Sequence, residues 1–176
     1  MRLSFHKLKE HSPHLYIQPA LAVVYVAFIL FLLSLVDQKA TLLWAIGVGA
    51  LSSSSYVVFV TPQAPVAKSR RILGGYFVGI TTGLVVHIIL SKLYTLMPES
   101  SHFHASHLFW VSAAITVGLS MLMMIIFSVE HPPAVGVSLV LVLNLEGYMT
   151  LVLIFVGALL LACIKWLLRK WLINLI

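Results

Sequence analysis

Apolar runs near the length of a membrane-spanning helix recur along this chain and leave few folds open to it. A helix needs about 20 apolar residues to cross ~30 Å of hydrocarbon. Only 9% of the residues are charged, whereas soluble domains carry roughly 25%. The sequence therefore predicts an all-α polytopic membrane protein with long spans at residues 20–36, 40–60, 72–90, 108–129 and 148–164.

A further apolar segment, residues 132–145, is much shorter than most of the others. As a helix it rises about 21 Å, which falls short of the ~30 Å core. The charges indicate whether it crosses, because Lys and Arg concentrate on the cytoplasmic side. With six spans and a cytoplasmic N-terminus, nine of the 11 Lys and Arg residues lie inside and only Lys39 and Lys92 lie outside. Five spans would move three C-terminal cations outside, so we expect about six transmembrane helices.

The two ends of the chain are expected on the same side of the bilayer. Residues 1–16 are polar and basic and predict a cytoplasmic N-terminal segment. The apolar run that follows is long enough to span and shows no small-residue cleavage site, so a removed signal peptide is not expected. Residues 17–176 suit one transmembrane domain. We expect both termini in the cytoplasm and the domain in a bacterial inner (plasma) membrane.

The stretch "FSVEHPPAVG", residues 127–136, separates the fourth run from the short segment. It holds Glu130, His131, Pro132 and Pro133. Proline is favoured in the first turn of a helix, and a helix N-terminus attracts anions through its free N–H groups and its dipole. We therefore expect the short fifth helix to start at these prolines, inside a protein-lined cavity rather than against lipid.

An earlier stretch, "FVTPQAPVA" at residues 59–67, repeats part of this pattern. When Phe59 is aligned with Phe127, Pro65 falls on Pro133. Both stretches follow an apolar run, precede another, and lie on the inner side in the six-span topology. An internal pseudo-repeat and chance similarity both explain this pattern, and transporters commonly bind substrate where such repeats meet.

Small and polar residues also occur inside the predicted spans. Ser52, Ser53, Ser54 and Ser55 are consecutive, and either pack against a neighbouring helix or line a polar path. Glycines at a spacing of four residues, which lets another helix approach closely, predict a packing stripe in the third span. They are Gly75, Gly79 and Gly83.

Three histidines in the outer loop, His102, His104 and His107, are close enough to suggest a metal site. Nothing nearby completes a tetrahedral ligand set, so we interpret them as a solvated loop and expect no metal and no cofactor. The chain has one cysteine, which leaves no internal disulfide to form.

Two motifs resemble the HPP family of small membrane proteins. One is the triplet His131-Pro132-Pro133. The other is residues 52–83, which hold a Ser-rich span end, prolines, a basic pair and a Gly-rich helix. The resemblance covers the second to fifth spans. Family members are associated with nitrite transport in cyanobacteria and chloroplasts, and are usually described with four transmembrane segments. Some carry a C-terminal CBS domain, which we do not expect here. The resemblance implies an HPP-type transmembrane domain and a small anion as substrate.

These features together predict a transporter or channel for a small anion, with nitrite as the first choice. His131 is expected to supply the charge or proton, and basic residues that include Arg71 to form the inner mouth. Glu130 is expected to be paired or protonated, because its carboxylate would repel an anion. The predicted substrate-binding residues are His131, Pro132, Pro133, Glu130, Ser52, Ser53, Ser54, Ser55, Pro62, Pro65, Lys68 and Arg70.

Two other classes of function remain open at this point. One is a proton or cation pathway that uses Glu130 and His131 directly. The other is a structural membrane protein without a substrate. An enzyme is not expected, because no nucleophile and base fall at a suitable spacing. The expected partners are a small inorganic anion and the lipid bilayer, with a homo-oligomer left open and no nucleic acid.

Overall fold

The structure is a computed structural model, and it describes residues 12–35, 41–96, 102–143 and 148–176. Within these residues it contains six α-helices and one short 3-10 helix. This confirms the predicted all-α membrane class. In chain order the elements are α2 (Ser12–Ser34), α3 (Thr41–Val60), η1 (Pro65–Ala67), α4 (Ser69–Leu96), α5 (His102–Ile126), α6 (Pro132–Leu143) and α7 (Tyr148–Leu167).

Four of these helices are long and apolar enough to cross a bilayer, by length and composition. They are α2, α4, α5 and α7. The well-described part of α3, Trp44–Val60, and all of α6 are shorter apolar helices. The 12 residues of α6 rise about 18 Å, which confirms that this helix is shorter than the ~30 Å hydrocarbon core.

The helices extend beyond the apolar runs at several ends. α2 begins at Ser12, inside the segment 1–16 that was expected to lead into the membrane, and α4 continues past Leu90 to Leu96. Apolar runs mark only the part of a helix that suits hydrocarbon, whereas polar residues at its ends remain helical. The opposite occurs in α5, which ends at Ile126 and not at residue 129.

The end of α5 is a Schellman turn. Ser128 has φ 53°, its N–H donates to Ile125 O at 3.0 Å, and the N–H of Val129 donates to Met124 O at 2.9 Å. This left-handed position usually holds glycine, because a side chain is disfavoured there. The turn redirects the chain so that Glu130 and His131 lie beside α4.

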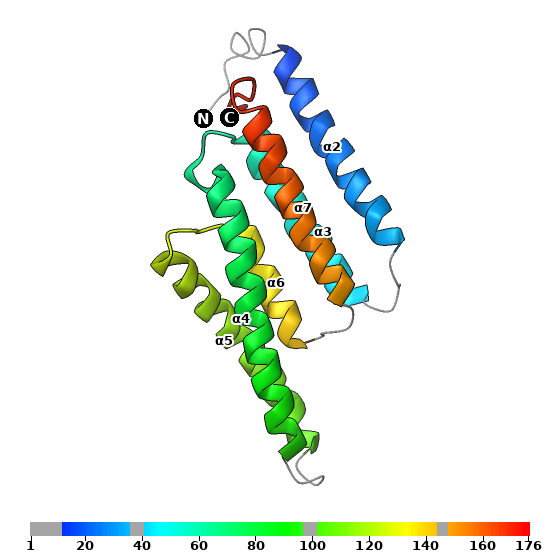
Figure 1. The fold of residues 1–176 in the computed structure, drawn as a ribbon, viewed down its shortest axis with the longest axis vertical. Helices are drawn as coiled ribbons and strands as arrows, with labels where there is room; N and C mark the ends of the chain where they lie inside the picture. The colour runs from blue at the N-terminus through cyan, green and yellow to red at the C-terminus, as the bar shows by residue number, and fades with distance from the viewer. Residues whose placement is uncertain (1–11, 36–40, 97–101, 144–147) are drawn as a thin grey trace.

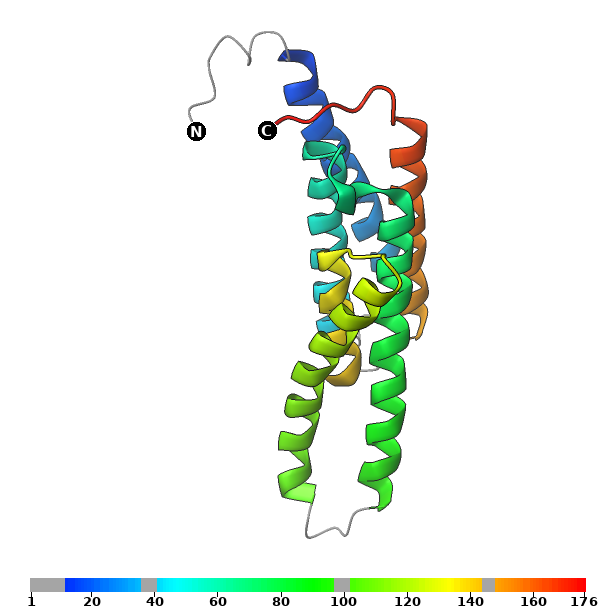
Figure 2. The same cartoon turned by 90° about the vertical axis from the view of Figure 1, so that its left-hand side faces the viewer.

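α6 lies in the middle of the bundle, as Figures 1 and 2 show, and it contacts α3, α4 and α5. Its backbone is therefore surrounded by protein along much of its length, which explains how a helix of this length is accommodated. The start of α2 and the C-terminal segment lie at the same end of the molecule, and α4 and α5 project at the other end. The described residues form six α-helices when α6 is included, and this number matches the prediction of six helical segments.

The glycine stripe of α4 packs against α6, which confirms the predicted close approach. A Cβ added to Gly75 would lie 2.5 Å from the Cβ of His131, and one added to Gly79 would lie 2.6 Å from Ala134 O. At Gly83 the added atom would meet Leu141 Cβ at 2.8 Å. One turn further, His87 Nδ1 lies 3.2 Å from Val142 O. Only glycine allows the two backbones to lie this close, and the stripe follows α6 from its start to its end.

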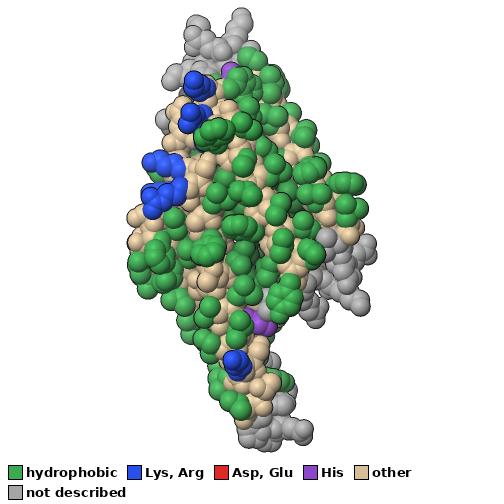
Figure 3. Space-filling model, in the orientation of Figure 1, with side chains coloured by type: hydrophobic (Ala, Val, Ile, Leu, Met, Phe, Trp, Pro, Cys, Tyr) green, Lys and Arg blue, Asp and Glu red, His purple; other side chains and the backbone are tan. Residues whose placement is uncertain are grey.

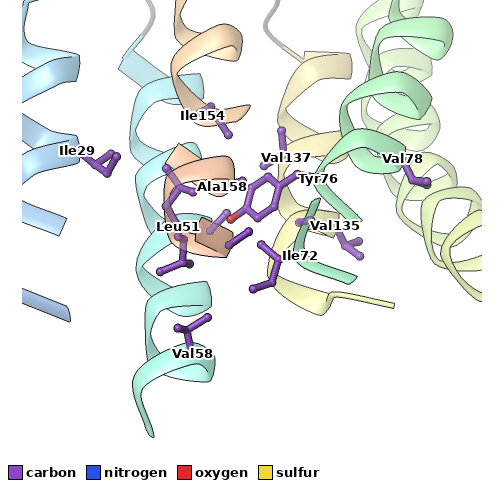
Figure 4. Close-up of a cluster of buried hydrophobic side chains, with 14 of the residues drawn as sticks. Ile29, Leu51, Val58, Ile72, Tyr76, Val78, Val135, Val137, Ile154 and Ala158 are labelled. Carbon is purple, nitrogen blue, oxygen red and sulfur yellow. The ribbon is translucent and has the colours of Figure 1, made fainter. Parts of the chain in front are cut away.

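The apolar core lies between α3, α4, α6 and α7, and Figure 4 shows side chains from these helices converging on it. Fully buried examples are Leu51, Ile72, Val137 and Ile154. Apolar side chains also cover most of the outer face shown in Figure 3, where Lys and Arg gather toward the end that carries the C-terminal segment. A surface this apolar suits lipid, and its cationic end agrees with the positive-inside pattern.

The segment after α7 folds back over the end of α3 and is held there by Gln18. The amide nitrogen of this buried side chain donates to Phe59 O and, at 2.9 Å, to Ile173 O. Its oxygen accepts from the N–H of Ile173 at 3.1 Å. The N–H of Leu175 donates to Val60 O at 2.9 Å. One glutamine thus ties α2, α3 and the C-terminal segment together.

Candidate functional site

The two similar proline-containing stretches meet in the folded chain. His131, from the second stretch, places its Nδ1 3.0 Å from Val66 O in the first. Their local structures differ, because Pro132 begins α6 directly while Pro65 begins the three-residue η1. α4 starts only at Ser69, so η1 separates Pro65 from the long helix that follows. The pairing of the two stretches nevertheless brings the starts of α4 and α6 to one place.

A buried polar cluster, made of Ser54, Tyr76 and His131, forms where these elements meet. All three residues have 0% exposure. Ser54 Oγ lies 2.8 Å from His131 Nε2 and 3.0 Å from the Tyr76 hydroxyl. The tyrosine and histidine rings are tilted against each other with centroids 5.8 Å apart. Figure 4 shows Tyr76 reaching across the core from α4 toward α3.

The sequence around the polar cluster makes this arrangement possible. Gly75 leaves the space that the Cβ of His131 occupies, so a larger residue would push the imidazole away from α4. Tyr76 follows directly and points into the core rather than along the glycine stripe. On α3, Ser54 Oγ also donates to Ala50 O of its own helix at 2.9 Å. The histidine ring is therefore held by backbone on one side and by a hydroxyl on the other.

The start of α6 offers fewer free N–H donors than predicted from the sequence. Pro132 and Pro133 have no N–H, and the N–H of Ala134 donates to His131 O at 3.0 Å. The expected free N–H groups are thus absent at these three positions. The helix dipole remains, and it favours negative charge at this end. The imidazole is also enclosed rather than presented, since both ring nitrogens contact protein atoms.

Glu130 lies beside the polar cluster and is paired, as expected. Its Oε2 is 3.1 Å from Arg71 Nη1, an ionic contact whose alignment does not meet hydrogen-bond geometry. Arg70 is exposed and its guanidinium lies 3.5 Å from Phe127 O. Lys68 is exposed directly before the start of α4. Among the residues that the structure describes, Glu130 is the only acidic one, so this end of the bundle has an excess of positive charge.

A cavity of about 250 Å³ lies next to the polar cluster, between α5 and the start of α6. Its apolar walls come from Met121, Met124, Ile125 and Val135, and its remaining lining from Glu130, His131 and Pro132. Since a water molecule takes about 30 Å³ of liquid, this volume accommodates a small hydrated ion. The cavity therefore leads to one side of His131.

The four consecutive serines do not act as one wall. Ser54 belongs to the polar cluster, while Ser53 is exposed, Ser52 is half-buried, and Ser55 is buried and donates to Ser52 O at 2.7 Å. Successive residues on a helix point about 100° apart, so one serine of the four reaches His131. Pro62 is buried and Pro65 exposed, and neither contributes a polar side-chain atom.

Tyr76 was not among the residues predicted from the sequence. The available signal was a tyrosine set between Gly75 and Gly79, two glycines of the predicted packing stripe. α5 begins at His102, so the histidines at positions 102, 104 and 107 lie in the first turns of this helix, and the expectation of a loop there is wrong. Their side chains lie outside those that the structure describes, so the absence of a metal site stays a prediction.

Comparison with known proteins gives a match along nearly the whole chain. The model of a family described as "HPP, transmembrane region" matches residues 12–173. A curated transmembrane protein of Dictyostelium discoideum is 28% identical over 99 residues, which are 56% of this chain and 30% of that relative. The chain thus aligns with less than a third of that relative's length. No solved structure matches the chain.

Proposed function

The chain belongs to the HPP transmembrane family, and from this premise we propose that it moves small inorganic anions, nitrite first among them, across the membrane. The observation that carries the proposal is the buried polar cluster of Ser54, Tyr76 and His131. It places hydroxyl and N–H groups in an apolar bundle. Polar groups inside a membrane domain are unfavourable to bury, and they often mark the path of a substrate.

The chemistry of the polar cluster suits an anion. Hydroxyls and an imidazole can donate hydrogen bonds, and these donors replace the water that an anion gives up on entering the bundle. The nearest carboxylate, on Glu130, is paired with Arg71. An anion that reaches His131 therefore meets donors and a neutralised ion pair instead of a free negative charge.

The surroundings supply an approach to the polar cluster from one end. Lys68 follows η1 and Arg70 lies in the first turn of α4, and both are exposed, where they raise the local concentration of anions. The cavity of about 250 Å³ brings the path to one side of His131. The final step needs a local opening, because Ser54 and Val66 enclose the ring. Closed contacts of this kind are expected in a transporter that alternates its access.

The same geometry disfavours a cation pathway. The pathway considered above uses the Glu130 carboxylate directly, and Glu130 instead faces Arg71 at 3.1 Å. The excess of Lys and Arg at this end would also repel a cation. We further propose that this end faces the cytoplasm of a bacterial cell, with both termini inside, because basic residues concentrate there.

Ion flux into proteoliposomes tests the proposed function. The purified chain is reconstituted, and influx of nitrite, nitrate, formate and chloride is followed against protein-free liposomes. The proposal predicts saturable influx of at least nitrite, unaffected when sodium replaces potassium. Flux that follows the cation and not the anion would establish the cation pathway in its place, and no flux for any ion would leave the structural alternative.

A further inference from the structure

Ser54 and His131 each make two or more polar contacts. If all of these contacts are hydrogen bonds at once, they fix the number of protons in the polar cluster. Val66 O and Ala50 O are carbonyl oxygens, which only accept hydrogen bonds. His131 Nδ1, 3.0 Å from Val66 O, must therefore carry a proton. Ser54 Oγ, 2.9 Å from Ala50 O, must direct its single proton to that carbonyl.

The contact between Ser54 and His131 then requires a proton from the ring. Nε2 lies 2.8 Å from Ser54 Oγ and has to donate, while the Tyr76 hydroxyl donates to the same oxygen at 3.0 Å. All four contacts are hydrogen bonds together only if both ring nitrogens carry protons. The fully bonded cluster thus contains an imidazolium cation.

A neutral ring changes one bond of the cluster. Nδ1 keeps its proton on Val66 O, Nε2 becomes an acceptor, and the Ser54 hydroxyl turns from Ala50 O to Nε2. Ala50 O remains available to its own helix, so no carbonyl is stranded. The two forms differ by one proton on His131 and by the direction of one hydroxyl.

The charged form has no counterion of its own. α3 bonds the ring through the Ser54 hydroxyl, which is neutral, and α5 lines the adjacent cavity with apolar side chains such as Met124. From α4 come the Tyr76 hydroxyl and Arg71, whose charge is balanced by Glu130, while Lys68 beyond η1 adds positive charge. A buried cation without a partner is unfavourable, and a small anion at the ring would provide that partner.

We propose that the protein takes up one proton on His131 with each anion, so that transport is anion–proton symport with the Ser54 hydroxyl as the element that turns. This inference rests on the proposed anion transport. The proton comes from solvent and binds Nε2 during the same local opening that admits the anion, because Ser54 covers this nitrogen in the closed cluster. The serine then returns to Ala50 O and accepts from Nε2–H. No covalent bond other than N–H forms or breaks.

The first test measures protons and anions together in proteoliposomes that contain a pH-sensitive dye. Nitrate is the main probe, because undissociated nitrous acid crosses bilayers unaided, and protein-free liposomes give the background. Coupling predicts that about one proton enters with each anion. It also predicts that the apparent Kd for the anion rises about tenfold for each unit of increase in pH, over the pH range where the His131 ring is neutral without the anion. Anion flux without proton movement overturns the coupling and leaves the proposed function intact, whereas absence of any flux removes both.

The second test compares two serines on the same helix. Ser54→Ala removes the hydroxyl that turns, whereas Ser55→Ala removes a buried hydroxyl that bonds only Ser52 O. We expect Ser54→Ala to lose anion-dependent proton uptake and Ser55→Ala to keep it. NMR of isotope-labelled histidine at fixed pH should show anion addition protonating His131 in the wild-type protein. A ring whose protonation does not respond to the anion, or equal coupling in both variants, contradicts the mechanism.

Discussion

Replacing Gly79 with leucine probes the close packing that holds α6 in the bundle. A Cβ at this position would lie 2.6 Å from Ala134 O, and ordinary contact begins at 3.4 Å. The difference, 3.4 − 2.6, means that α6 must move by about 0.8 Å, because the obstructing atom belongs to the backbone and cannot rotate away. Overpacking of this kind costs about 1–3 kcal/mol, and the remaining atoms of leucine add to it.

The matched control is Gly118→Leu on α5, where an added Cβ meets nothing within 4 Å. For a chain of this length 1 kcal/mol corresponds to about 2–4 °C in Tm. We expect Gly79→Leu to lower Tm in detergent by about 2–12 °C or to prevent folding. Gly118→Leu should be neutral or slightly stabilising, since leucine favours helix over glycine by about 0.8 kcal/mol. Equal melting of the two variants would refute the packing argument.

Three further changes test other parts of the structure. Gln18→Leu should destabilise the protein by about 1–3 kcal/mol, because the carbonyl and N–H groups that Gln18 bonds lose their hydrogen bonds. The measurement is Tm, and an unchanged Tm would show that Gln18 does not hold the C-terminal segment. Arg71→Gln should slow anion influx by leaving the Glu130 carboxylate unneutralised, and adding Glu130→Gln should restore it; slow influx in both would assign the loss to the arginine itself. In a Cys163→Ser background, Lys68→Cys should label only from the cytoplasmic side and Lys92→Cys only from the outside, and labelling of both from one side would rule out the proposed topology.

The parts of the fold that follow from residue spacing could be predicted from the sequence. Gly75, Gly79 and Gly83 recur every four residues, so a close-packed stripe was evident although its partner was not. The 12-residue α6 was recognised as too short because length and rise are properties of the segment alone. The pairing of Glu130 also followed from a local argument, since an unpaired carboxylate was incompatible with an anion site.

The parts that depend on how helices rotate against each other could not be predicted. Choosing Ser54 from its three serine neighbours requires knowing which face of α3 meets α6, and that face is set by side chains far along the chain. Tyr76 was missed for the same reason. The lost donors at Pro132 and Pro133 were readable in principle, because proline has no N–H, and the expectation of an anion held by those groups overlooked it.

Anion influx in two histidine variants is the most direct measurement of the proposed site. His131→Ala removes the ring from the polar cluster, whereas His87→Ala removes a half-buried histidine from the other end of the same α4–α6 contact, where it bonds Val142 O and Ser91. His131→Ala removes the positive charge that pairs with the anion, and a charge-assisted contact is worth roughly 1.5–3 kcal/mol, or about 10- to 150-fold in affinity. We expect His131→Ala to lose affinity for the anion by this factor, and His87→Ala to show near wild-type influx. Size-exclusion chromatography should show that both variants are folded. Equal influx in the two variants would show that His131 is a structural residue and that the anion passes elsewhere.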